Sequence, residues 1–247
     1  MSNVVIVTGG SRGIGAATCQ LVAKAGNIVC VNYVSNIAAA NDVVCAIEGE
    51  GGKAFCVKGD VGNNDDVIAM FKAADEYGTL TGLVNNAGIV DVKSRVDNFS
   101  PQRLERMMRV NVLGSFYCAR EATLRMSNKY GGKGGSIVNI TSAAATIGGA
   151  GQYVDYAASK GAIDTFTTGF AREVAQEGIR VNAVRPGIID TQIHASGGEP
   201  DRLEKLVSTV PMKRAGTAME VAQAIGWLLS DAASYVTGTT IDVTGGR

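Results

Sequence analysis

The stretch VVIVTGGSRGIG, residues 4–15, joins a β-branched apolar run to a glycine-rich turn and then to a helical pattern. An apolar run of this length predicts a buried strand, and residues 14–25 are typical of the helix that follows it. Glycines at such a turn let a phosphate approach the backbone, and the helix N-terminus offers unpaired N–H groups and a positive dipole. The stretch therefore predicts a nucleotide-binding βα unit.

The spacing of the turn also admits a rival interpretation. It is T-G-x-x-x-G-x-G, and no lysine follows Gly15, so the turn is not a P-loop. Residues 9–13, GGSRG, fit the G-x-S-x-G nucleophile elbow of a serine hydrolase, with Ser11 as the nucleophile. That chemistry needs a later acid and then a histidine. The one histidine, His194, falls in a loop-like segment, so the hydrolase is the less favoured alternative.

Outward from the turn, short apolar runs alternate with helical patterns along the whole chain. The further predicted strands are 28–33, 54–57, 80–85, 136–140, 180–184 and 239–243, and the further helices are 37–47, 65–77, 104–129, 154–176 and 220–229. Strands buried on both faces of a parallel sheet have this pattern. We expect one α/β domain over residues 1–247, a Rossmann-type doubly wound, mostly parallel seven-stranded sheet with helices on both faces. Residues 187–217 are expected to form a substrate lid; the alternative is a plain surface excursion with a short helix at 201–208.

Composition narrows the class of protein. The chain has 247 residues, of which 46% are hydrophobic and 19% charged, and 23 basic residues balance 23 acidic ones. This balance gives no electrostatic footprint for nucleic acid or a membrane surface. Five cysteines without a C-x-x-C pair predict neither a disulfide framework nor a metal site. With no signal peptide and no apolar run near ~18 residues, we expect a cytoplasmic protein.

Three side chains in the second half suit proton transfer at a carbonyl or alcohol oxygen. Tyr156 and Lys160 are spaced i, i+4 on a predicted helix and share one face. A phenol with a pKa of ~10 is a poor acid or base at neutral pH, and a nearby cation lowers that pKa. Ser142 follows the fifth predicted strand, where its hydroxyl could hold the substrate oxygen.

These motifs stand in an order that points to a known family. They are Thr8-Gly9-x-x-x-Gly13-Ile14-Gly15, Asn85-Asn86-Ala87-Gly88, Asn111, Ser142, Tyr156-x-x-x-Lys160, Pro186-Gly187 and Tyr235-Val236-Thr237-Gly238. The chain resembles the classical short-chain dehydrogenase/reductases over essentially its whole length. Two departures are visible. The spacing from Ser142 to Tyr156 is one residue longer than in many relatives, and residues 241–246 lack the Asp that usually precedes the glycine pair.

The resemblance implies a role for each catalytic residue. Tyr156 would be the general acid/base, and Lys160 would lower the pKa of Tyr156 and bind the nicotinamide ribose. Ser142 would orient the substrate carbonyl, and Asn111 would hold a water in the proton relay. The implied cofactor contacts are Gly9, Ser11, Arg12, Ile14, Gly15, Asn32, Tyr33, Ser35, Asp60, Val61, Asn86, Ala87, Gly88, Tyr156, Lys160, Pro186, Gly187, Ile189 and Thr191. Within this set, Asp60 and Val61 would meet the adenine, and residues 186–191 would pack on the nicotinamide.

The end of the second predicted strand predicts which nicotinamide coenzyme is used. An NAD-binding fold usually carries an acid there, but residues 31–36 are VNYVSN and the first acid afterwards is Asp42. Arg12 in the glycine turn could pair with a 2′-phosphate, and Ser35 could donate a hydrogen bond to it. We therefore expect NADP to be preferred, with tolerance of NAD left open. Many NADP-using relatives carry a second basic residue where Val34 stands.

The substrate stays open at this point, as a small carbonyl or alcohol compound. One candidate is a 3-oxoacyl carrier-protein thioester, which would need a basic docking surface such as Arg125, Lys129 and Arg172. The other is a sugar or polyol. A catalytically silent NADP-binding protein is an alternative outside the enzymes. The resemblance also implies a homotetramer, built through the helices near 104–129 and 154–176.

Overall fold

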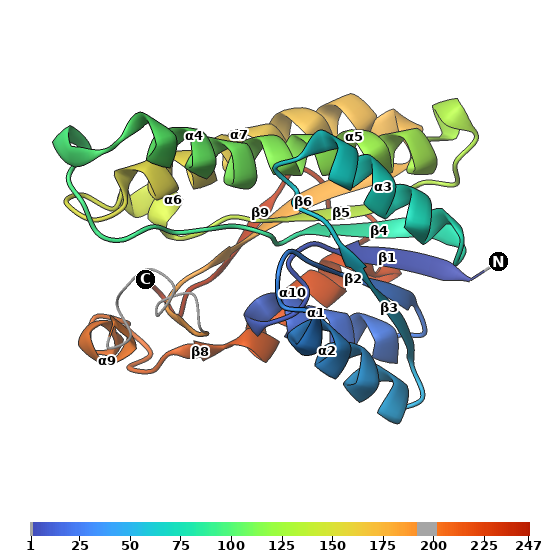
Figure 1. Cartoon of the computed structure of the whole chain (residues 1–247), viewed down its shortest axis with the longest axis horizontal. Helices are drawn as coiled ribbons and strands as arrows, with labels where there is room; N and C mark the ends of the chain where they lie inside the picture. The colour runs from blue at the N-terminus through green and yellow to red at the C-terminus, as the bar shows by residue number, and fades with distance from the viewer. Residues whose placement is uncertain (1, 192–201) are drawn as a thin grey trace.

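Seven parallel strands form the centre of the molecule. The structure, a computed structural model, describes residues 2–191 and 202–247 (Figure 1). The strand order is β3-β2-β1-β4-β5-β6-β9, and every neighbouring pair is parallel. The strands are β1 (Asn3–Val7), β2 (Ile28–Tyr33), β3 (Lys53–Lys58), β4 (Thr79–Asn85), β5 (Gly135–Ile140), β6 (Ile179–Pro186) and β9 (Thr240–Val243). This topology confirms the predicted doubly wound α/β fold.

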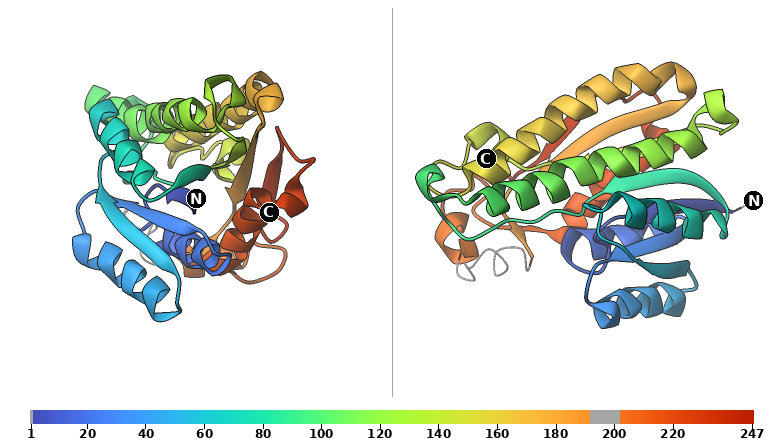
Figure 2. Two further views of the ribbon diagram at one scale, coloured as in Figure 1. Left: turned by 90° about the vertical axis from the view of Figure 1, so that its right-hand side faces the viewer. Right: turned by 45° about the horizontal axis from the view of Figure 1, so that its top comes forward.

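Two helical layers cover the sheet (Figures 1 and 2). One layer holds α1 (Gly13–Lys24), α2 (Ile37–Gly49) and α10 (Ala218–Leu229), and the other holds α3 (Asn64–Asp75), α4 (Pro101–Met108), α5 (Gly114–Met126) and α7 (Val154–Val174). Each layer forms its own apolar core. In β1, Val5 and Val7 belong to the core on the α1 side, whereas Val4 and Ile6 belong to the core on the α5 side. Both faces of β1 are thus buried, which explains its uninterrupted apolar run.

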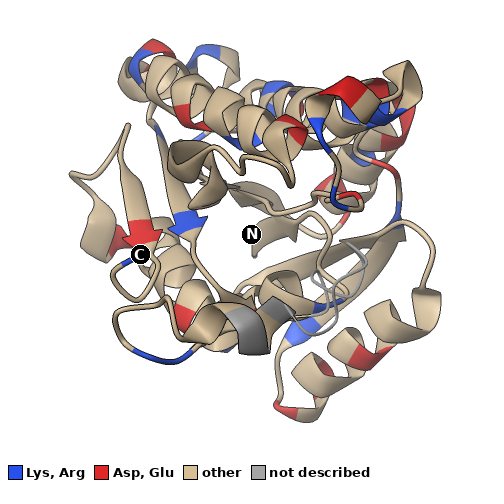
Figure 3. Ribbon diagram, turned by 90° about the vertical axis from the view of Figure 1, so that its left-hand side faces the viewer, with Lys and Arg blue, Asp and Glu red and all other residues tan. Residues whose placement is uncertain are grey.

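The strand order reverses beside β1, which lies between β2 and β4. In open α/β sheets, ligands bind outside the carboxyl ends of the strands at such a switch point. Figure 3 looks onto the carboxyl ends of the strands, where the glycine turn after β1 lies near the loops after β4, β5 and β6.

The predicted helix over 104–129 is not continuous. Ser100 caps α4 by accepting a hydrogen bond from the Arg103 N–H, with Pro101 at the first helical position, so this helix starts earlier than expected. A π turn, η2 (Arg109–Leu113), then separates α4 from α5, which starts at Gly114. The prediction missed this turn because one wide turn barely disturbs the apolar periodicity.

The segment between β6 and α10 is only partly described. Ile189–Asp190 (β7) pairs with Gly216–Thr217 (β8) in a small parallel sheet, and Arg202–Val207 forms α9. The sequence indicated a short helix at 201–208, close to α9, but it did not show β7 or β8. His194, in the same predicted 187–217 lid, lies outside the described residues. In the described part of the chain, no helix is long and apolar enough to cross a membrane.

Candidate active site

A cleft with a volume of about 390 Å³ lies at the carboxyl ends of the central strands. Helix α7 contributes Tyr156 and Lys160 to it, and the loop after β5 contributes Ser142. The other predicted site residues that line the cleft are Ile14, Asn86, Gly88, Pro186, Gly187, Ile189 and Thr191. The fold thus brings the predicted serine, tyrosine and lysine to one cavity from two separate elements.

Lys160 is buried at the floor of this cleft. Its Nζ donates a hydrogen bond to the Ile140 carbonyl at 2.7 Å and lies 5.8 Å from the centre of the Tyr156 ring. Burial lowers the pKa of Lys160 to about 8, against a smaller opposing effect of Asp164.

Asn111 lies in the π turn and holds the loop after β4. Its Oδ1 accepts from the Ile89 N–H at 2.8 Å, and its Nδ2 donates to the Ile89 carbonyl at 2.9 Å. A Cβ on Gly88 would lie 3.4 Å from both Asn111 Oδ1 and Lys160 Nζ, so the two polar groups converge on one glycine. Asn111 therefore borders the lysine, although its own side chain is buried.

Ser159 is a member of this network that the sequence reasoning missed. Its hydroxyl donates to the Tyr156 carbonyl at 2.7 Å and accepts from Asn111 Nδ2 at 3.1 Å. Asn111 is thereby linked to the backbone of the turn that carries Tyr156. The available signal was its place beside Lys160, inside the Y-x-x-x-K motif.

The long spacing between Ser142 and Tyr156 is filled by a short helix, α6 (Ala144–Ile147). Ser142 Oγ accepts from the Ala144 N–H at 3.1 Å, which orients the hydroxyl at the start of this helix. Gly148 and Gly149 then adopt positive φ angles of 84° and 61° and turn the chain back towards α7. The segment between Ser142 and Tyr156 thus forms a helix-and-turn excursion that borders the cleft.

The glycine turn has the geometry of a phosphate-binding loop. Gly9 has a φ of +61°, and its N–H donates to Asn32 Oδ1 at 3.1 Å. A Cβ on Gly15 would lie 2.3 Å from the Gly9 carbonyl oxygen, so only glycine fits there. Asn86 Nδ2 donates to that same carbonyl at 3.0 Å. Helix α1 begins without a side-chain cap from Arg12, and Ile14 in its first turn lines the cleft. The first N–H groups of a helix have no partner within the helix.

Several predicted cofactor contacts have side chains already engaged elsewhere. Asn32 is buried and donates to the Gly59 carbonyl at 2.9 Å, in addition to its bond with Gly9. Asp60 Oδ1 accepts from the Gly62 N–H at 2.8 Å, and both Tyr33 and Val61 are buried among apolar residues. Direct contact of these residues with a cofactor stays a prediction.

The remaining predicted contacts lie at the edge of the glycine turn and of β2. Arg12 and Ser35 are exposed, whereas Ser11 and Ala87 are partly buried. No group of three or more His, Cys, Asp or Glu side chains in the described ranges could hold a metal ion.

Comparison with known proteins finds relatives along nearly the whole chain. A family model described as Enoyl-(Acyl carrier protein) reductase matches residues 9–247. An uncharacterized oxidoreductase of Escherichia coli, YgfF, is 55% identical over 99% of both chains. Glucose 1-dehydrogenase 2 of Bacillus subtilis is 37% identical over 98% of this chain and 93% of its own. A 3-oxoacyl-[acyl-carrier-protein] reductase of Synechocystis sp. is 37% identical over 99% of this chain and 96% of its own.

Proposed function

Because the chain belongs to the short-chain dehydrogenase/reductase family and is an oxidoreductase of CH–OH and carbonyl groups, we propose that it interconverts a ketone or aldehyde and an alcohol with NADP(H). The observation that carries this proposal is the convergence of Lys160 Nζ and Asn111 Oδ1 on Gly88, in the cleft that Tyr156 lines.

In this proposal, Tyr156 is the group that moves the proton. In reduction, its hydroxyl donates to the substrate oxygen, and in oxidation its phenolate accepts from the alcohol. The Lys160 cation stabilises the phenolate, and Ser142 holds the substrate oxygen by a hydrogen bond. Asn111 acts beside Lys160, where it supports a water for proton exchange with solvent. When bound, the nicotinamide supplies or accepts the hydride.

The glycine turn fits a dinucleotide on its own geometry. A methyl group at Gly15 or Gly9 would collide with Asn86 and neighbouring backbone, so glycine keeps the turn closely packed at the start of α1. The first N–H groups of that helix are where an anion would bind. The residues after β2 favour NADP, since Val34 is exposed and no carboxylate stands between Tyr33 and Asp42. Exposed Arg12 is the cation that would pair with the 2′-phosphate.

The lining of the cleft favours a substrate with an apolar body over a free sugar. The apolar side chains beside the catalytic residues include Val90, Ala144, Ile147, Ala150 and Ile188. Each sugar hydroxyl moved against such a wall loses its hydrogen bonds to water.

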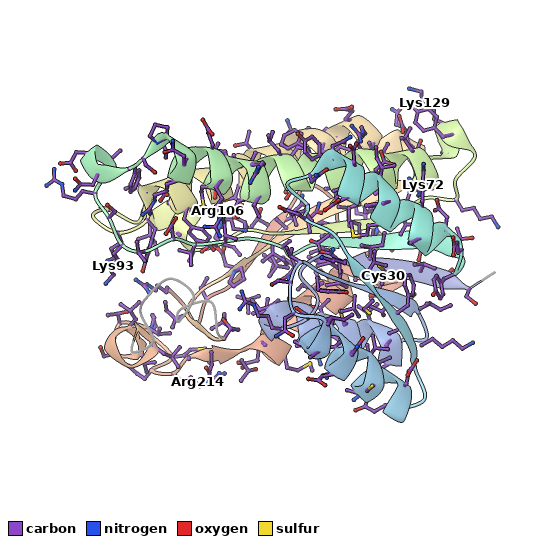
Figure 4. The ribbon with its side chains drawn as sticks, viewed as in Figure 1. Cys30, Lys72, Lys93, Arg106, Lys129 and Arg214 are labelled. Carbon is purple, nitrogen blue, oxygen red and sulfur yellow. The ribbon has the colours of Figure 1, made fainter. Side chains whose placement is uncertain are left out.

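The acyl-carrier alternative has weaker support. Arg125 pairs with Asp75 and Glu121. Lys129 lies just before β5, at the end of the molecule away from Lys93 (Figure 4), whereas the cleft lies at the carboxyl ends of the strands. A docking surface at Arg125 and Lys129 would therefore be remote from the cleft of the same protomer.

We extend the proposal to the assembly and its setting. Leu104, Met108, Leu113 and Phe116 lie exposed along α4, η2 and α5, and Phe116 stacks on Phe166 of α7 at 3.9 Å. This apolar face supports a homotetramer joined through these helices, which sedimentation equilibrium would test. A single domain in the cytoplasm, with 187–217 acting as a lid, completes the proposal.

Replacement of Tyr156 tests the proposed reaction. Tyr156→Phe should lower kcat about 10²- to 10⁴-fold with ketone substrates while leaving the Kd for NADPH within twofold. Tyr77→Phe, on the stacked Tyr77–Phe55 pair, is the matched control and should keep full activity. Full activity of Tyr156→Phe would refute the assignment. NADPH binding without turnover by the wild type, across ketones and aldehydes, would favour the silent-binding alternative.

A further inference from the structure

Arg247 lines the same cleft as Tyr156, and its side chain ends in a positively charged guanidinium. Among the lining residues that the structure describes, Lys160 and Arg247 are the charged ones, and neither Asp nor Glu is present. The whole chain has as many acidic residues as basic ones. The absence of Asp and Glu from the described lining is therefore not a consequence of composition. Viewed from the cleft side, most of the Asp and Glu positions lie on the helices that cover the sheet (Figure 3).

The backbone before Arg247 is fixed on both sides. The Gly187 N–H donates to the Val243 carbonyl at 3.0 Å, and the Met212 N–H donates to the Gly245 carbonyl at 3.2 Å. Gly245 and Gly246 both adopt left-handed conformations, with φ angles of 65° and 91°. A side chain on Gly246 would press against Pro211 at 3.1 Å. The segment after β9 is therefore directed to the cleft by contacts that require its glycine pair.

Arg247 is one of the arginines that no ion pair holds in place within the described residues. Arg103, Arg125, Arg185 and Arg214, in contrast, each form an ion pair with a carboxylate. Across residues 2–191 and 202–247, no carboxylate pairs with the exposed Arg247. A guanidinium offers two parallel donors that match the two oxygens of a carboxylate.

We propose that Arg247 is a specificity residue that binds a carboxylate of the substrate, so that the substrate is an apolar oxo acid or the corresponding hydroxy acid. The apolar wall of Val90, Ala144, Ile147 and Ile188 accommodates the carbon chain between the two polar ends. The carbonyl end meets Tyr156 and Ser142, and the acid end meets Arg247. This inference rests on the proposed carbonyl reduction, and it identifies which carbonyl compounds the cleft selects.

Paired probes that differ in one charge test the inference. The probes are 6-oxoheptanoate and its methyl ester, each reduced with NADPH by the wild type and by Arg247→Gln. We expect the variant to lose roughly ten- to hundredfold in kcat/KM for the acid, mainly through KM, and to stay within twofold for the ester. Arg247→Lys should recover part of the loss. Lys72→Gln removes one positive charge on α3, far from the cleft, and should change neither value (Figure 4).

Each outcome bears on one claim. Equal losses for the acid and the ester, or no loss for either, would overturn the role of Arg247 while leaving carbonyl reduction intact. If the wild type reduces neither probe nor any other ketone, the proposed function fails, and calorimetry then decides the inference. The inference is supported if Arg247→Gln binds 6-oxoheptanoate at least tenfold more weakly than the wild type in the presence of NADPH. It is overturned if the two proteins bind the acid equally or if the wild type does not bind it.

Discussion

Arg103 of α4 and Asp155 of α7 form a buried two-point ion pair one residue before Tyr156. Arg103 Nε lies 2.7 Å from Asp155 Oδ2, and Nη2 lies 3.2 Å from Oδ1. The side chains are 9% and 2% exposed. Arg103 Nη1 also donates to the Val92 carbonyl at 2.7 Å. One side chain thus joins the loop after β4, helix α4 and the first turn of the helix that carries the proposed acid/base.

Removing one partner of this pair should be costly. Asp155→Ala leaves the Arg103 guanidinium buried without its carboxylate, and we expect the free energy of unfolding to fall by about 3–5 kcal/mol, measured by urea denaturation. The control is Asp97→Ala, which breaks the exposed Arg95–Asp97 pair and should cost less than about 1 kcal/mol. Similar losses in the two variants would show that the buried pair has no special role.

The titration of Lys160 should appear in the stability of the protein. In the fold its pKa is about 8, whereas in the unfolded chain it is ~10.4. Between these values the unfolded state binds more protons, so this residue makes the free energy of unfolding rise with pH. Below about pH 8 the fold carries the full cost of the buried cation, on the order of 3 kcal/mol.

The free energy of unfolding should be measured against pH for the wild type and for Lys160→Met, and the two curves subtracted. The subtraction is needed because buried thiols change the stability with pH in the opposite direction. Burial raises the pKa of Cys19, Cys30 and Cys118, so stability falls where the unfolded thiols ionise. These contributions cancel when the Lys160→Met curve is subtracted from that of the wild type. The difference should increase by about 3 kcal/mol from pH 7.5 to pH 10.5. A flat difference would contradict the assigned pKa.

A carboxylate at the end of β2 should reverse the expected coenzyme preference. We expect Val34→Asp to weaken NADPH binding at least tenfold, because the new charge repels a 2′-phosphate, and to leave NADH binding equal or tighter. Fluorescence titration with each coenzyme measures this. Val96→Asp is the control at an exposed valine in η1 (Val96–Asn98), away from β2. Tighter binding of NADH than of NADPH by the wild type would overturn the preference itself.

Gly15 should tolerate no side chain. Its Cβ would lie 2.3 Å from the Gly9 carbonyl oxygen, so Gly15→Ala must move the backbone of the glycine turn. We expect coenzyme binding to weaken more than tenfold and the melting temperature to fall. Gly49→Ala, at the end of α2, has no atom within 4 Å of the new methyl and should change the stability by less than about 1 kcal/mol. Normal binding by Gly15→Ala would remove the turn from the proposed coenzyme site.

The sheet could be predicted because its signal is local. Each strand is a short apolar run, and the run in β1 is continuous because Val4 and Val5 belong to different cores. The i, i+4 spacing likewise placed Tyr156 and Lys160 on one face before any tertiary information was used.

Features that depend on distant contacts were not predictable in this way. The π turn at Asn111 differs from the flanking helices only in one wider turn. The bond from the Gly9 N–H to Asn32 depends on two strands lying side by side, so the support of the glycine turn by Asn32 could not be predicted from local pattern. Asp155 and Arg103 are 52 positions apart and look like ordinary surface charges in the sequence.

The two ends of the described chain differ in how they can be used for attachment. β1 begins at Asn3, at the amino ends of the strands and opposite the cleft, whereas Arg247 lines the cleft itself (Figure 1). An affinity tag, reporter domain or surface linker joined before residue 2 would leave the cavity accessible. The same addition after residue 247 would crowd its mouth and alter catalysis. Biosensor and immobilisation designs for this protein should therefore use the N-terminal side.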